Sequence, residues 1–256
     1  MSRIVVFIHG MYLGGSSWQP WINRAASQGR DYTCHAPSWP YHDGAPEQLR
    51  AAMDPALGTL TFGQIIDYYK EIIDALREKP VLVGHSVGGL VVQKLINGGY
   101  GMAGVAVSPA TPRGVLAFGP NFLRANFPHL NPLAGNRPIR MTARRFHYAF
   151  GNTMTRADSD AAFEAYTVPE SRNVPRSTLT RQAAIDFTKP HPPMLIITAD
   201  KDHLTPRAMI KRNVRKYPPA AGTLDFAEFR GRSHLLCGQT GWEEVADHVF
   251  AWIDQH

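Results

Sequence analysis

Short apolar segments without polar alternation recur along this chain, and each of them stops at a turn. Four share this pattern: Ile4–Ile8, Val81–Val83, Val105–Val107 and Met194–Thr198. A strand with both faces buried has no polar positions, which is typical of parallel sheets covered by helices. Two weaker candidates, Tyr32–His35 and Leu224–Phe229, bring the expected sheet to about six strands.

Helical patterns separate these segments. The clearest runs from Phe62 to Leu76, with apolar residues three and four positions apart, and stops before Lys79-Pro80. Further helices are expected at Leu90–Ile96, Pro206–Tyr217 and Trp242–Ile253. Strands that alternate with helices form right-handed βαβ units, so the sequence predicts an α/β fold with a doubly wound, mostly parallel sheet.

The alternation fails between residues 111 and 190. This segment is rich in Pro, Asn, Arg and aromatic residues, and its helical patterns are short, near Ser159–Tyr166 and Ser177–Phe187. We therefore expect a core made of residues 1–110 and 191–256, with a helical cap inserted at 111–190.

The net charge of +6 comes entirely from the same segment, which holds eleven Lys and Arg against five Asp and Glu. Its arginines are scattered and no nucleic-acid-binding motif lies beside them, so no nucleic-acid partner is expected. The excess of arginine either forms a solvated surface or favours anionic substrates.

The strongest chemical signal is Gly84-His85-Ser86-Val87-Gly88-Gly89, which directly follows a predicted strand and directly precedes a predicted helix. A serine at such a sharp turn projects its hydroxyl above the sheet in a strained conformation. Strand and helix approach so closely there that Gly84 and Gly88 must lack side chains. The positive end of the helix also stabilises negative charge nearby. The pattern predicts Ser86 as a nucleophile.

With this motif the sequence resembles the α/β-hydrolase superfamily, in the cap-bearing branch of esterases, lactonases and cofactor-free haloperoxidase-like enzymes. His9-Gly10-Met11, after the first strand, matches the HG-x turn of that family. The resemblance implies an oxyanion hole formed by the backbone N–H groups of Met11 and Val87, with His9 packed beneath the turn. The first strand begins near residue 4, so we expect the fold without the N-terminal hairpin of many members, as in plant methylesterases and hydroxynitrile lyases.

The acid and the base of a serine triad are expected near the C-terminus. Asp202 stands three positions after Ala199 and four before Pro206, which is the register of the family, and Asp200 is the alternative acid. His234 follows the last predicted strand and is the expected base, because the resulting chain order of nucleophile, acid and base is the one this fold uses. The acid would hold the imidazole in the right tautomer.

These residues predict a serine carboxylic-ester hydrolase that acts through an acyl-enzyme on a small ester or lactone. The same triad also serves hydroxynitrile lyases, perhydrolases and cofactor-free oxygenases, and slow-turnover ligand sensors share the fold, so these functions are alternatives. Aromatic residues expected to line the substrate pocket are Trp39, Phe118, Phe122, Phe127, Phe146, Tyr148 and Phe150.

Cofactors and membrane partners are not expected. No zinc-ligand spacing is present, and neither a G-x-G-x-x-G motif nor a P-loop follows a strand. No apolar run is long enough to cross a bilayer or to form the core of a signal peptide, so we expect a cytoplasmic protein. Cys34 and Cys237 are expected to be reduced, although one bridge between them is an alternative. The sequence leaves the oligomeric state open.

Overall fold

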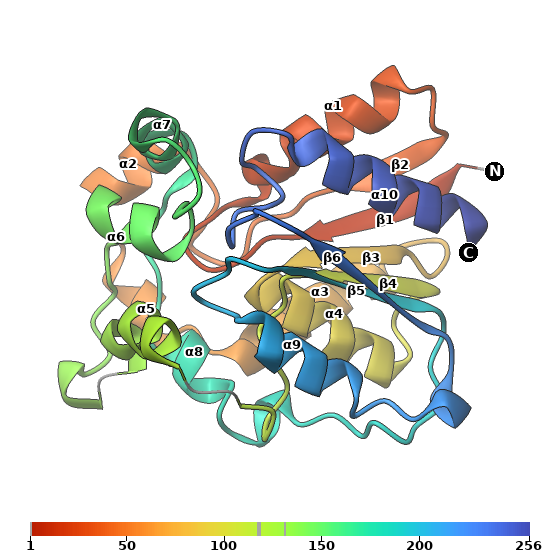
Figure 1. Ribbon diagram of the computed structural model, residues 1–256. Helices are drawn as coiled ribbons and strands as arrows, with labels where there is room; N and C mark the ends of the chain where they lie inside the picture. The colour runs from red at the N-terminus through yellow and green to blue at the C-terminus, as the bar shows by residue number, and fades with distance from the viewer. Residues whose placement is uncertain (1, 117–118, 131) are drawn as a thin grey trace.

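The computed structural model describes residues 2–116, 119–130 and 132–256 and contains a six-stranded sheet with the order β2-β1-β3-β4-β5-β6 (Figure 1). All five neighbouring pairs are parallel. The strands are β1 (Arg3–Ile8), β2 (Tyr32–His35), β3 (Val81–His85), β4 (Ala103–Val107), β5 (Met194–Ala199) and β6 (Leu224–Phe229). The predicted doubly wound parallel sheet of about six strands is therefore confirmed, and all six predicted segments are strands.

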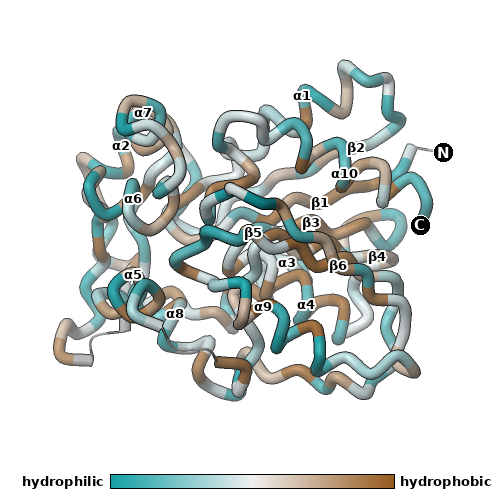
Figure 2. Tube along the Cα trace, in the orientation of Figure 1, coloured by the Kyte–Doolittle hydropathy of each residue, from teal (hydrophilic) through white to brown (hydrophobic). Residues whose placement is uncertain are grey.

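Helices cover both faces of this sheet, as Figure 1 shows. Alternate residues of β1 explain why: Val5 and Phe7 pack with α1 (Gln19–Ser27) and α10 (Trp242–Gln255), whereas Val6 and Ile8 face α3 (Phe62–Asp74) and α4 (Val87–Gly98). On the second face, α9 (Arg207–Val214) packs against β4 and β5 through Ile210. Figure 2 shows the apolar residues concentrated in the central strands between these two layers. The sheet has apolar side chains on both faces, which is why its strands lack polar alternation.

The remaining helices lie mostly in the 111–190 segment. They are α5 (Pro120–Leu130), α6 (Ala143–Ala149), α7 (Arg156–Tyr166) and α8 (Asn173–Ser177), joined by α2 (Pro46–Ala51), which packs against α7. Short 3-10 turns lie at Gly15–Trp18, Pro55–Thr59, Pro132–Ala134, Arg181–Ala183 and Pro219–Ala221. In Figure 1 these helices form a separate group beside one end of the sheet. The predicted helix near Ser159–Tyr166 is α7.

The predicted helix at Ser177–Phe187 is wrong. Helix α8 ends at Ser177, and the hydroxyl of Thr180 accepts a hydrogen bond from the Gln182 N–H, which starts a separate single turn. Beyond that turn, Lys94 Nζ donates to the carbonyl of Ala184 over 2.6 Å, and the side chain of α4 residue Asn97 donates to the carbonyl of residue 186 over 2.7 Å. These carbonyls are bound by α4 side chains, so tertiary contacts replace the hydrogen bonds of a continued helix.

Two further features bear on the expectations from sequence. Cys34 and Cys237 are free thiols, so no bridge joins them. Within the described ranges of the chain, no helix is both long enough and apolar enough to cross a membrane.

Candidate active site

Ser86 occupies the sharp turn between β3 and α4, with a φ of 57° and a ψ of −120°. A positive φ is strained for a residue with a side chain, and such strain persists only where the surroundings fix it. The Ser86 N–H donates to the carbonyl of Val107 over 3.0 Å, and its carbonyl accepts from the Ala110 N–H over 2.8 Å. The ends of β3 and β4 therefore hold the strained serine in place.

The glycines on either side of Ser86 allow this close approach. A Cβ added at Gly84 would lie 2.2 Å from the carbonyl oxygen of Gly88, and one added at Gly88 would lie 2.2 Å from the carbonyl oxygen of Ile8. Both neighbours are backbone atoms and cannot rotate away. The steric requirement that the sequence motif predicted is present at both positions.

His234 and Asp202 are joined by a hydrogen bond of 2.7 Å between Nδ1 and Oδ2, and both side chains are fully buried. Asp202 Oδ1 accepts from the N–H groups of Leu204 and Thr205, each over 2.8 Å, and Oδ2 also accepts from the Thr205 hydroxyl. Burial alone would raise the pKa of Asp202, but the charge and hydrogen bond of His234 and the donors of Thr205 lower it below its usual value. The carboxylate therefore stays ionised beside the imidazole.

The other ring nitrogen of His234, Nε2, is buried and makes no hydrogen bond to Ser86. Because Nδ1–H donates to Asp202, Nε2 carries the lone pair, and among the described residues it has no hydrogen-bond partner. The backbone of His234 is anchored beside the nucleophile, since His85 Nε2 contacts the His234 carbonyl oxygen over 2.8 Å. The ring also packs against Phe150, with 5.2 Å between ring centroids.

Asp200, the alternative acid, lies elsewhere. Its Oδ1 accepts from the Gly231 N–H over 2.6 Å, and its other oxygen lies 3.7 Å from Lys201 Nζ. This carboxylate joins the loops that follow β5 and β6, and none of its contacts is with His234. The geometry thus selects Asp202 as the carboxylate that orients the imidazole.

Met11 and Val87 line the same pocket as Ser86. In the part of the chain that the structure describes, neither backbone N–H donates a hydrogen bond. Val87 is the first residue of α4, where helix N–H groups have no intrahelical acceptor and the helix dipole is positive. The pocket that contains Ser86 therefore has two backbone donors without acceptors in its described wall.

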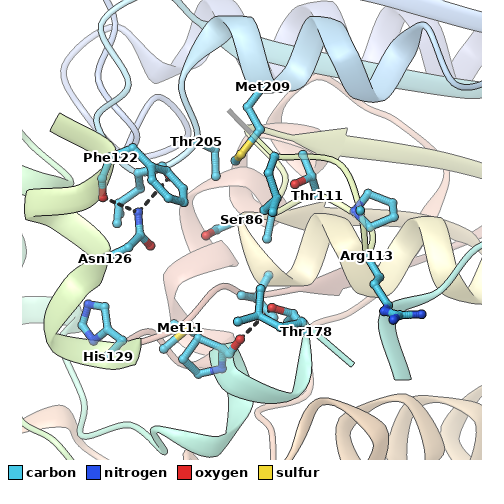
Figure 3. Close-up of a pocket in the computed structure, with 18 of the residues that line it drawn as sticks. Met11, Ser86, Thr111, Arg113, Phe122, Asn126, His129, Thr178, Thr205 and Met209 are labelled. Carbon is cyan, nitrogen blue, oxygen red and sulfur yellow. Dashed lines mark hydrogen bonds between the residues drawn. The ribbon is translucent and has the colours of Figure 1, made fainter. Parts of the chain in front are cut away.

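A pocket of about 590 Å³ opens over Ser86 (Figure 3). Its wall combines residues from the ends of the strands with residues of the 111–190 segment, and most of them are apolar. In chain order the wall comprises Met11, Tyr12, Ser86, Val87, Ala110, Thr111, Pro112, Arg113, Gly114, Leu116, Phe122, Asn126, His129, Phe150, Pro175, Thr178, Leu179, Ala184, Ile185, Leu204, Thr205 and Met209. Arg113 is the only Lys, Arg, Asp or Glu among these residues. The arginine excess of the 111–190 segment therefore lies almost wholly outside the pocket, which removes the main reason to expect anionic substrates.

The aromatic residues predicted for the wall divide into two groups. Phe122 and Phe150 line the pocket. Trp39 and Phe146 do not, because both are fully buried: Trp39 stacks on His9, and Phe146 stacks on Phe150 with 5.1 Å between ring centroids.

Two further predicted aromatic residues, Tyr148 and Phe127, also lie outside the pocket wall. Tyr148 lies in a separate, arginine-rich cleft, where Arg124 stacks over its ring at 4.1 Å. Phe127 is 68% exposed. Phe118 falls outside the described residues.

Several polar wall residues were not predicted from sequence, among them Tyr12, Asn126 and His129. The Asn126 Nδ2 donates to the carbonyls of Phe122 and Leu204, over 3.0 and 3.2 Å (Figure 3). The Tyr12 hydroxyl lies 2.7 Å from His129 Nδ1. No local pattern marks these residues, since they meet only because α5 lies across from the turn after β1.

Three buried histidines should make the protein sensitive to acid. Burial lowers the pKa of His85 and of His129 to about 3, and it lowers the pKa of His9 well below its usual value. These groups are neutral in the folded protein but take up protons in the unfolded chain below about pH 6.5. The free energy of unfolding should therefore fall as the pH decreases from about 6.5 towards 3, by up to about 4 kcal/mol per pH unit for three protons.

Urea unfolding at pH 7, 6 and 5 measures this slope. His42 does not add to this slope. Burial opposes its charge, but Glu170 raises its pKa, so near pH 7 it opposes the loss of stability, because the unfolded chain takes up this proton only below about pH 6.5. The variant His129→Gln should reduce the slope by about 1 kcal/mol per pH unit. A free energy of unfolding that is constant between pH 6.5 and 5 would contradict the assignment of neutral histidines.

A metal-dependent mechanism has no evident ligand set here. Among the residues with described positions, no group of three or more His, Cys, Asp or Glu side chains could hold a metal ion.

Comparison with known proteins agrees with this fold. A sequence model described as the alpha/beta hydrolase family matches residues 5–248. No curated protein sequence matches this chain. Similar solved structures include a methylesterase from Arabidopsis, with 13% identity, a TM-score of 0.69 and coverage of 99% of this chain and 100% of that one.

Two other similar structures have different printed activities. A monoacylglycerol lipase from Paleococcus ferrophilus has 19% identity and a TM-score of 0.68, with 97% and 93% of the two chains covered. A methylketone synthase from tomato, complexed with 2-tridecanone, has 15% identity and a TM-score of 0.69, with 100% and 99% covered. At these identities the likeness shows the fold alone.

Proposed function

This chain belongs to the alpha/beta hydrolase family, and we propose that it is a serine carboxylic-ester hydrolase that acts on a small, uncharged ester or lactone through an acyl-enzyme. The observation that carries the proposal is the buried 2.7 Å hydrogen bond between Asp202 and His234, which leaves Nε2 as a base in a protein whose Ser86 occupies a strained turn. Esterases and a lipase among the similar structures support the same reaction class.

In the proposed first step, His234 Nε2 takes the proton of the Ser86 hydroxyl while Oγ forms a bond to the ester carbonyl carbon. The carbonyl oxygen becomes an oxyanion that accepts hydrogen bonds from the Met11 and Val87 N–H groups. Collapse of this intermediate breaks the bond to the alkoxy oxygen, and His234 returns its proton to the leaving alcohol. Asp202 stabilises the imidazolium that exists between these events.

In the second step, His234 removes a proton from a water molecule, whose oxygen attacks the acyl carbon. The Ser86–acyl bond then breaks and His234 returns the proton to Oγ, which releases the carboxylic acid. Each step uses the same oxyanion donors, so both barriers depend on the geometry of the turn that carries Met11.

The pocket supports an uncharged substrate. Its wall is largely apolar, Arg113 is the only permanently charged residue in the described wall, and burial lowers the pKa of His129 to about 3, so that ring is neutral. Arg113 is exposed and its side chain points away from Ser86 (Figure 3), so an anionic acyl or alcohol group at Ser86 would lose its hydration without a cation beside it. In this proposal the 111–190 segment acts as the cap that selects the substrate.

Labelling with an activated fluorophosphonate tests the nucleophile. We expect stoichiometric labelling of the wild-type protein and none of the variant Ser86→Ala. In this proposal Ser86 is the serine that His234 activates and whose oxyanion the Met11 and Val87 N–H groups bind. Ser108 also has a positive φ but is fully buried, so Ser108→Ala serves as a control that should label like the wild type. Labelling that persists in Ser86→Ala would contradict the assignment.

Turnover of matched esters tests the reaction. Neutral p-nitrophenyl esters should give repeated turnover with a higher kcat/KM than anionic esters of the same length. A single stoichiometric release would instead indicate a ligand sensor, and equal kcat/KM values for both ester types would contradict the proposed preference for uncharged substrates.

A further inference from the structure

A buried carboxylate from the 111–190 segment lies beneath the turn that carries Met11. Glu170 is fully buried, and its Oε2 accepts from the Tyr12 N–H over 3.1 Å and lies 3.2 Å from His42 Nε2. Its Oε1 accepts from the Ser171 N–H over 2.7 Å. None of these groups takes part in the proposed catalytic steps. The catalytic steps therefore do not explain why a carboxylate is buried here.

His42 neutralises this carboxylate. Its Nδ1 lies 3.1 Å from the carbonyl oxygen of Pro40 and its Nε2 contacts Glu170, so both ring nitrogens face acceptors and both must carry protons. Both side chains are fully buried. A buried ion pair contributes little to stability compared with apolar residues, so a gain in stability does not explain why this pair is buried.

The pair holds Tyr12, the residue next to Met11, in an unusual conformation. Tyr12 has a φ of 64°, in the left-handed region that residues with side chains rarely adopt. Its N–H is bound by Glu170, and its carbonyl accepts from the Val168 N–H over 2.9 Å. One short stretch of the 111–190 segment therefore fixes both polar backbone groups of Tyr12.

The peptide group on the other side of Met11 is fixed as well. The carbonyl of Gly10 belongs to the same peptide unit as the Met11 N–H, and it accepts from the Leu13 N–H over 3.3 Å. His9 Nδ1 lies 2.9 Å from the same carbonyl oxygen, and His9 Nε2 accepts from the Trp39 N–H, so Nδ1 carries the proton and donates to Gly10. Because the peptide is trans and planar, holding this carbonyl aims the Met11 N–H in the opposite direction.

We propose that Glu170, with its proton-bearing partner His42, is a positioning residue that aims the Met11 N–H at the oxyanion. This inference rests on the proposed hydrolase function. His9 orients the peptide before Met11, and Glu170 orients the peptide after it, so Met11 has no freedom to rotate away from the pocket. A charged acceptor suits this task because hydrogen bonds to a carboxylate are shorter and stronger than those to a neutral group.

The experiment compares Glu170→Gln and Glu170→Ala with the wild type in two kinds of measurement. The first is kcat and KM for a neutral p-nitrophenyl ester. The second is calorimetric binding of a trifluoromethyl ketone, whose carbonyl carbon gains a bond to Ser86 Oγ and forms an oxyanion, against binding of the product carboxylic acid. Glu164→Gln is the matched control, because Glu164 lies in the same segment but is exposed and pairs with Arg50 on the surface.

We expect kcat to fall about tenfold in Glu170→Gln, which keeps one acceptor oxygen, and about 100-fold in Glu170→Ala, which is the lower limit of the range seen when an oxyanion donor is lost outright. KM should change less than about twofold. Affinity for the ketone should fall by the same factors as kcat, whereas affinity for the product acid should stay constant. Glu164→Gln should match the wild type throughout.

A role that is only structural would lower the melting temperature but leave folded protein with unchanged kcat and unchanged affinity for the ketone, and that result would overturn the proposal. If Glu170→Ala does not fold, the same comparison on Glu170→Gln decides the question. Ketone binding is measured without turnover. A wild type that binds the ketone but does not turn over esters would therefore contradict the hydrolase function while the test of Glu170 still stands.

Discussion

Replacing Asp202 by asparagine should lower kcat for ester hydrolysis by about 10³- to 10⁴-fold while the protein remains folded. The Asn side chain keeps an oxygen for the N–H groups of Leu204 and Thr205, which now bind Oδ1 over 2.8 Å. Its amide nitrogen then faces His234 Nδ1 as a donor, which favours the tautomer with the proton on Nε2. That tautomer cannot accept the proton of Ser86, and the same change in a well-studied serine triad has an effect of this size.

Asp200→Asn is the matched control for this measurement. Asp200 lies two residues away, but its side chain contacts Gly231 and Lys201 and has no described contact with His234. We expect its kcat to stay within about twofold of the wild type, in line with other surface changes. If Asp200→Asn lost as much activity as Asp202→Asn, the orienting role could not be assigned from the buried hydrogen bond.

Some features of the site could be predicted from the sequence because they depend on residues that are close together in the chain. The sharp turn that carries Ser86 could be predicted because its requirements are local: a strand, a serine, two glycines and a helix within about fifteen residues. The choice of Asp202 over Asp200 came from the resemblance, because Ala199 and Pro206 place Asp202 in the register of that family. The doubly wound parallel sheet could be predicted from the alternation of strands and helices, because such strands are joined by right-handed βαβ crossovers, but the order of the strands was not predicted.

The pocket wall could not be predicted in the same way. Aromatic residues in the 111–190 segment were natural candidates, and Phe122 and Phe150 do line the pocket. Phe146, however, packs inside that segment by stacking on Phe150. Sequence composition does not distinguish an aromatic residue that packs on its own segment from one that contacts a ligand.

The contacts of Tyr12 were also beyond sequence reasoning. Glu170 and His42 are separated by 128 positions, and the positive φ of Tyr12 has no marker such as glycine. Buried polar pairs of this kind arise from tertiary packing. Here the packing brings the loop after β2, which carries His42, against the part of the 111–190 segment that carries Glu170.

A substitution at Gly88 should cause a large loss of stability. The new Cβ of Gly88→Ala would lie 2.2 Å from the Ile8 carbonyl oxygen and 2.4 Å from that of His9. Relief requires α4 to move away from the end of β1, which would also displace the turn that carries Met11. We expect the free energy of unfolding to fall by about 3 kcal/mol or more, at the upper end of overpacking effects.

Urea unfolding measures this loss, and Gly238→Ala is the control. Gly238 is exposed, has no positive φ, and an added Cβ there would meet Leu235 at an ordinary distance of 3.5 Å. Its free energy of unfolding should stay within about 0.5 kcal/mol of the wild type. A Gly88→Ala protein with wild-type stability would mean that α4 can withdraw from β1 at no cost. That result would contradict a steric requirement for glycine at position 88.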